Sequence, residues 1–153
     1  MKISELMTSD PVCCTADTTL RDVARMMVEF DCGEIPVCDS SERGHIVGVI
    51  TDRDIVCRAV ADGLDMSQTP VSKCMTSPAV TASCDTSLKD AMEMMETNMI
   101  RRLPITDETG CICGILSQAD IAMKADKDST AEVVMEVSKP TDHSSRVNTT
   151  SNR

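Results

Sequence analysis

The sequence predicts a mixed α/β (α+β) fold built from two tandem copies of one β-α-β-β-α unit. The main observation is an internal repeat: at an offset of 68 residues Met7-Thr8-Ser9 matches Met75-Thr76-Ser77, and Pro36 matches Pro104. Each copy also contains, in the same order, a segment with the helical period and short apolar segments typical of strands. A repeat of this kind indicates a duplicated unit of roughly 60 residues.

A capped amphipathic helix is predicted near the start of each unit, after a short extended segment at 12–15 or 79–82. A hydroxyl residue three positions before an acidic residue is typical of a helix amino terminus. Apolar residues then recur with the helical period, so one face of each helix should pack on a core. The capping pairs are Thr19 with Asp22 and Ser87 with Asp90, and the apolar faces are Leu20, Val23, Ala24, Met27 and Val28, and Leu88, Ala91, Met92, Met95 and Met99.

Two short strands and a second helix complete each unit. Each first strand contains a proline, which is typical of an edge strand or of the first position in a strand. A polar turn then leads to a second apolar strand and to a helix. These elements are strands 35–38 and 45–51 with a helix from near Asp52, and strands 103–106 and 111–117 with a helix from near Gln118.

The composition divides the chain into four parts. Residues 1–66 are expected to form the first unit with its polar connector, and residues 67–125 the second unit. A terminal helix is expected at 126–138. A flexible tail is expected at 139–153, because this segment is rich in Ser, Thr and Asn and lacks an apolar face.

Charge and aromatic content argue against several partners. The chain has 153 residues and a formal net charge of −10, so neither a nucleic-acid backbone nor an anionic membrane is an expected partner. Phe30 is the only aromatic residue, so adenine or another base is expected to be held by aliphatic walls and backbone groups rather than by stacking.

The sequence also indicates a compartment. It contains no run of about 18 apolar residues, and its start lacks the apolar core of a signal peptide, which predicts a soluble, cytoplasmic protein. The nine cysteines are odd in number and no export signal accompanies them, so reduced thiols are expected.

Two related stretches, Gly48 to Ile55 and Gly114 to Ile121, are the candidate binding motifs. Each carries a hydroxyl residue where a strand ends and an Asp three residues later on the first turn of a helix. An ionised Asp accepts charge-assisted hydrogen bonds from the vicinal hydroxyls of a ribose. Helix capping is the alternative role for the same Asp. The pairs are Thr51 with Asp54 and Ser117 with Asp120.

Met-Thr-Ser-x-Pro or Met-Thr-Ser-Pro, then Ile-Pro-Val or Leu-Pro-Ile, and then Gly-Val-Ile-Thr-Asp-Arg-Asp or Gly-Ile-Leu-Ser-Gln-Ala-Asp recur in order over about residues 1–125. In this order they resemble a tandem cystathionine-beta-synthase (CBS) domain pair, or Bateman module, of the stand-alone kind. The resemblance implies two units related by pseudo-twofold symmetry, with sheets packed together and helices outside, and pairing into a homodimer. It also implies a regulatory sensor that binds AMP, ADP, ATP or S-adenosylmethionine and needs no obligatory cofactor.

The resemblance further implies two clefts, each shared between the units. One takes Thr51 and Asp54 with Ile100, Arg101 and Arg102, and the other takes Ser117 and Asp120 with Cys32, Gly33 and Glu34. The extended segments before the first helices are expected to add Val12 and Cys13, and Val80 and Thr81, to the ligand-binding residues.

The two clefts are expected to differ in charge. Arg53 joins Arg101 and Arg102 in the first cleft, and guanidinium groups suit phosphate, so this cleft should prefer a phosphorylated adenosine. The second cleft has Gln118 and Ala119 in place of Asp52 and Arg53, and Glu34 in place of Arg102, so it should bind phosphate poorly or take a neutral or cationic adenosyl ligand. A solvated helix end is the alternative role for the arginine pair.

An enzyme is not predicted, because no nucleophile–base set, Walker-type loop or metal-ligand cluster is evident. The methionines at helical spacing are expected to fill the core. The alternative function is a redox- or metal-responsive CBS pair that uses its cysteines. The cysteine spacings are not those of structural zinc sites, whereas Cys13, Cys14 and Cys32 near the predicted cleft leave redox sensing open. Cys38, Cys57, Cys111 and Cys113 are expected to be small buried residues.

Overall fold

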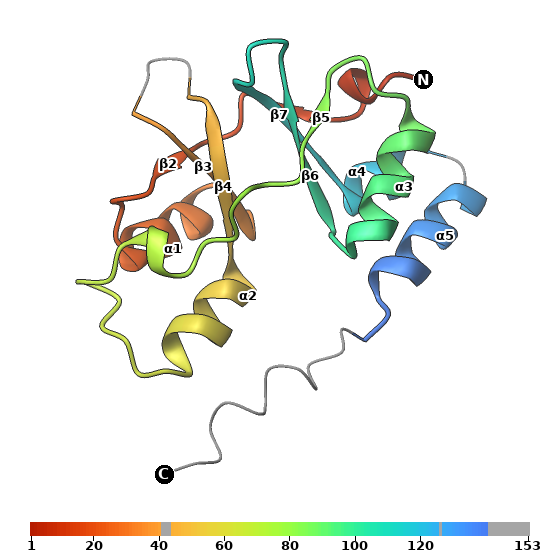
Figure 1. Cartoon of the computed structure of the whole chain (residues 1–153). Coiled ribbons are helices and arrows are strands. Elements are labelled where there is room, and N and C mark those ends of the chain that lie inside the picture. Colours follow the sequence, from red (N-terminus) through yellow and green to blue (C-terminus); the bar gives the residue numbers. More distant parts are fainter. Residues whose placement is uncertain (41–43, 126, 141–153) are drawn as a thin grey trace.

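The computed structural model describes residues 1–40, 44–125 and 127–140, and it confirms the predicted fold of two β-α-β-β-α units (Figure 1). The first unit contains β2 (Cys14–Thr15), α1 (Leu20–Glu29), β3 (Glu34–Cys38), β4 (Ile46–Thr51) and α2 (Asp52–Ile55), which continues as one π-helical turn (Val56–Val60). The second contains β5 (Ala82–Ser83), α3 (Leu88–Asn98), β6 (Arg102–Thr106), β7 (Ile112–Ser117) and α4 (Gln118–Lys124).

Each unit contributes one small sheet. In both, the short first strand runs parallel to the proline-containing strand, which pairs antiparallel with the next strand. Figure 1 shows α1 and α2 on one side of the molecule and α3, α4 and α5 on the other, with β4 and β7 between them. The two sheets meet where these strands begin, because the Ile46 amide donates to the Gly110 carbonyl and the Ile112 amide donates to the Gly44 carbonyl.

The segment that enters each unit packs on the other unit. Strand β1 (Thr8–Ser9) pairs with β7 of the second unit, and Ile3 in the preceding 3-10 turn (Ile3–Glu5) is buried in the second core. Reciprocally, Thr76 pairs with Val49 of β4, and the 3-10 turn Val71–Lys73 contributes to the first core. The cores therefore do not follow the division of the sequence at residues 66 and 67.

Glycine is needed where these entry segments cross the sheets. A Cβ atom on Gly48 would lie 2.7 Å from the backbone oxygen of Thr76. The equivalent atom on Gly114 would collide with the side chain of Met7. The glycine that opens each candidate binding motif is thus explained by close packing of the exchanged segment.

Both long helices start at the predicted caps. Oγ1 of Thr19 accepts from the Asp22 amide at 3.2 Å, and Oγ of Ser87 accepts from the Asp90 amide at 3.1 Å. Most of the predicted apolar faces pack on the cores, but Val28 is 84% exposed. It lies eight residues after the buried Leu20, which rotates it by about 80° from the buried stripe.

The second unit is extended by one more helix, α5 (Lys127–Val137), within the range where a terminal helix is expected. Val133 and Val137 bury this helix against the second core. Met99, which was expected on the buried face of α3, ends that helix in the left-handed conformation and is 37% exposed. Residues 141–153 of the expected flexible tail lie outside the described residues. Over the described ranges no helix is long and apolar enough to cross a membrane.

Candidate functional site

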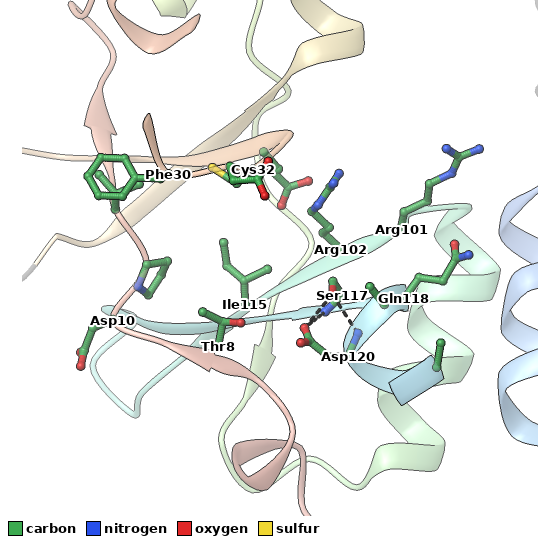
Figure 2. A pocket seen from close by; sticks show the side chains of 16 residues that line it. Thr8, Asp10, Phe30, Cys32, Arg101, Arg102, Ile115, Ser117, Gln118 and Asp120 are labelled. Carbon is green, nitrogen blue, oxygen red and sulfur yellow. Dashed lines mark hydrogen bonds between the residues drawn. The ribbon is translucent and has the colours of Figure 1, made fainter. Parts of the chain in front are cut away.

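A cavity of about 630 Å³ lies between the two units (Figure 2). Its floor is the end of β7 and the start of α4, and β1 runs along one side. The segment between α1 and β3 brings the first unit to the opposite wall. The lining includes Val12, Phe30, Cys32 and Glu34 from the first unit, and Arg101, Arg102, Ile115, Ser117, Gln118 and Asp120 from the second.

Ser117 and Asp120 form a closed capping box on the cavity floor. The Asp120 amide donates to Oγ of Ser117 at 3.1 Å, and Oδ2 of Asp120 accepts from the Ser117 amide and hydroxyl at 2.8 and 2.6 Å. The capping role considered for this Asp is therefore present. All three bonds leave Oδ1 of Asp120 unused, so the carboxylate keeps an acceptor for a ligand.

Thr51 and Asp54 form the same box in the first unit, at 3.0 and 3.1 Å, but outside the cavity lining. Oδ1 of Asp54 also lies 3.7 Å from Nε of Arg58. A further Arg58 nitrogen, Nη1, donates to the Cys74 carbonyl, which holds this side chain against the segment that enters the second unit. Both oxygens of Asp54 thus have protein partners, unlike those of Asp120.

The arginines lie beside the motif of the second unit, and Arg102 also approaches the first motif, because its guanidinium and the Asp52 carboxylate both lie next to Gly33. Arg101 and Arg102 were expected with Thr51 and Asp54, but both line the cavity of Ser117. The strand register is the reason, because Arg102 lies opposite Ser117 in the β6–β7 pair and the Arg101 carbonyl accepts from the Gln118 amide. The motif that was expected to bind phosphate poorly therefore has two cations beside it.

The remaining predicted residues fall into two groups. Val12 and Cys32 line the cavity together with the motif of the second unit. Arg53, Gly33, Cys13, Val80, Thr81 and Ile100 do not belong to its lining, and Val80 and Ile100 pack against the second core.

Phe30 is a cavity residue that the sequence reasoning missed. The absence of a suitable aromatic was inferred from composition, yet this ring lies on the cavity wall and is 52% exposed (Figure 2). Its position two residues before Cys32, at the end of the first helix, was the available signal. A flat apolar surface is therefore present beside the polar floor.

Glu34 is the most unusual charged residue of the cavity. It is 7% exposed, and its Oε1 atom is buried with no hydrogen-bond partner among the described residues. Burial raises the pKa of its carboxyl to about 7; the Arg102 guanidinium opposes this rise, and Asp54 and Asp52 add to it. The Oε1 atom of Gln118 is a second buried acceptor without a partner among those residues.

The sequence matches a known family in both halves. The family model of the CBS domain fits residues 3–60 and again residues 71–127. The chain belongs to the CBS domain family. It is 35% identical over 129 residues to the CBS domain-containing protein YhcV of Bacillus subtilis (strain 168), a match covering 84% of this chain and 89% of that protein. The resemblance seen in the motifs is confirmed, and the match indicates no enzyme family.

Solved structures share the arrangement of this CBS pair. The CBS domain protein PAE2072 from Pyrobaculum aerophilum, complexed with AMP, is 26% identical with a TM-score of 0.76, and the match covers 88% of this chain and 99% of that one. Hypoxic Response Protein I, with two coordinated zinc ions, is 28% identical with a TM-score of 0.73, and the match covers 82% and 100% of the two chains.

The cysteines of this CBS pair are all free thiols. Cys57 is exposed, contrary to expectation, because it lies on the outer face of the π-helical turn. Sγ of Cys84 lies 2.8 Å from Sγ of Cys113, and a hydrogen bond from Cys38 lowers the pKa of Cys13. In the described part of the chain, no group of three or more His, Cys, Asp or Glu residues could hold a metal ion.

Proposed function

We propose that this CBS pair is a regulatory module that binds an adenosyl ligand in the cavity between its units. The observation that carries the proposal is the meeting, in one cavity, of the ribose-type motif Ser117 and Asp120 with the guanidinium groups of Arg101 and Arg102. The AMP complex of the similar protein PAE2072 supports the same ligand class.

Each part of the ligand has a suitable partner in the cavity. The unused Oδ1 of Asp120 accepts from ribose hydroxyls, and the arginines face phosphate. Phe30 and Ile115 offer apolar surface to adenine. A ligand that contacts both units regulates by favouring the arrangement to which it binds more tightly.

Calorimetric titration of the protein with AMP, ATP and S-adenosylmethionine tests the proposal, with thermal unfolding as the second readout. A ligand at 100 times its dissociation constant should add about 2.7 kcal/mol of stability. We expect one ligand per chain in this cavity. Absence of binding by all three compounds would refute the proposal.

The duplication supplies matched variants. Asp120→Asn should weaken binding about tenfold or more, because a charge-assisted bond is replaced by a neutral one. Asp54→Asn changes the equivalent capping box outside the cavity and should leave this binding unchanged. Equal losses in both variants would contradict the assignment of the ribose to Asp120.

A second site at Thr51 and Asp54, with Arg53, Val80 and Ile100, remains a separate proposal from the family pattern. It predicts a second equivalent of ligand per chain that Asp54→Asn alone removes. Titration to saturation of the wild type and both variants decides between one site and two.

The module is further proposed to be a cytoplasmic homodimer, as the family resemblance suggests. Val56, Val60 and Met123 give the helices that follow the two motifs an exposed apolar surface, at 57%, 56% and 78% exposure. Light scattering of the wild type and of Val60→Glu tests this proposal, and a monomeric wild type would refute it.

A further inference from the structure

We infer that Glu34 sets the charge of the adenosyl ligand that the cavity accepts, favouring a cationic ligand when ionised and a phosphorylated ligand when neutral. This inference rests on the proposed function, because it concerns the ligand of the same cavity. It assigns selection between ligands to a carboxyl group that belongs neither to the ribose motif nor to the arginine pair.

The geometry of Glu34 requires a hydrogen-bond donor from the ligand. The residue is 7% exposed, and its Oε1 atom has no partner within the described residues. Polar atoms buried in folded proteins are nearly always paired. Gln118, on the second-unit wall, has an unpaired buried Oε1 of the same kind. Two such acceptors in one cavity favour a ligand that brings donors to both walls.

The charges around Glu34 act in opposite directions. The Arg102 guanidinium favours the carboxylate, whereas burial and the carboxylates of α2 favour the neutral acid. Figure 2 shows Arg102 extending from β6 toward the end of the cavity where Cys32 lies. No ion pair joins Glu34 to Arg102 in the described ranges, and both side chains line the cavity. The surrounding titratable and charged groups are Arg102 on β6, Asp52 and Asp54 on α2, and Asp31 and Cys32 before β3.

Ligand charge and the proton of Glu34 are therefore linked. Phosphate at Arg102 adds negative charge near the carboxyl and binds with uptake of a proton, whereas a sulfonium or ammonium group favours the carboxylate and binds with its release. Affinity for AMP should fall, and affinity for S-adenosylmethionine should rise, as pH increases through the range near 7 where this carboxyl titrates. One linked proton changes an affinity by at most about tenfold per pH unit.

The test compares the full chain with Glu34→Gln by calorimetry, using AMP, S-adenosylmethionine and adenosine between about pH 6 and pH 8. Glutamine has the shape of the neutral acid and cannot ionise. Ionisation of the ligands themselves affects binding to both proteins equally. Dividing the wild-type affinity by the variant affinity at each pH therefore removes this effect. As the pH rises from about 6 to 8, the ratio of wild-type affinity to variant affinity should fall about fivefold to tenfold for AMP. It should rise by a similar factor for S-adenosylmethionine and stay constant for adenosine.

Two controls keep the result interpretable. Glu96→Gln removes another carboxyl whose pKa is raised by burial and by neighbouring glutamates, but on α3 outside the cavity, and it should leave all three ratios unchanged. Wild-type titrations in buffers of different ionisation heat need no variant, and they should show proton uptake with AMP and release with S-adenosylmethionine.

The outcomes separate the two claims. Ligand binding whose affinity ratios do not change with pH, and which exchanges no proton with the buffer, would overturn the role of Glu34 and leave the proposed function standing. Absence of binding by all three compounds at every pH would overturn both.

Discussion

Replacement of Glu34 by glutamine is expected to flatten the pH dependence of folding stability without any ligand present. Burial raises the pKa of this carboxyl from 4.5 to about 7 in the folded protein, so the folded state holds its proton more tightly than the unfolded chain does. Stability is therefore greatest below about pH 4.5 and is lost as pH rises through 7. At about 1.4 kcal/mol for each pH unit between the two values, the loss is about 3 kcal/mol.

Urea denaturation of the wild type and of Glu34→Gln at about pH 5 and pH 8 measures this effect. The quantity compared between the two proteins is the change in unfolding free energy from the lower pH to the higher pH. The wild type should lose about 2.5 kcal/mol more than Glu34→Gln does between these conditions, because part of the effect is already lost at about pH 5. Every other titratable group ionises in both proteins, so its contribution to the pH dependence of stability cancels in this comparison. A difference below about 1 kcal/mol would mean that water or a rearranged Arg102 solvates the carboxylate, and the burial argument would fail.

Three further predictions concern packing, phosphate recognition and thiol chemistry. Gly48→Ala should cost about 1–3 kcal/mol in urea denaturation, and more than Gly114→Ala, because its new methyl group meets a backbone oxygen rather than a movable methionine side chain. Arg102→Gln should reduce the preference for AMP over adenosine about tenfold in calorimetry, and an unchanged preference would exclude phosphate from this wall. Oxidised glutathione should link Cys84 to Cys113 before other pairs, by two-electron oxidation of both thiols. Burial raises the pKa of Cys113 to about 12, so mass spectrometry should detect faster linkage at higher pH, and a different first pair would contradict the contact.

The repeat made most of the fold predictable from local patterns. Helix period, hydroxyl–acid caps and proline-containing strands are short-range signals, and they located α1, α3 and the four long strands. Exchange of the entry segments was not predictable in this way. Pairing of Thr8 with Ile115 joins residues 107 positions apart, and nothing in either segment identifies the partner strand.

The candidate cavity was predictable in part. The family pattern grouped Ser117, Asp120, Cys32 and Glu34, and the structure places all four in the lining of one cavity. The placement of the arginines in the first cleft stays a prediction, because Arg102 lies near Asp52 as well as in the cavity of Ser117. Their side chains also reach the end of their own unit's β7, a consequence of strand register that sequence spacing does not reveal.

The duplication itself explains why the two motifs do not offer equal sites. Glu34 and Arg102 occupy equivalent positions of the repeat, each as the first residue of its strand and each opposite the hydroxyl residue of its motif. Opposite charges at equivalent positions break the symmetry of the pair, because both residues reach the same cavity. That cavity consequently holds both a guanidinium group and an acid that resists ionisation, and the proposed selection of ligand charge by Glu34 rests on this pairing.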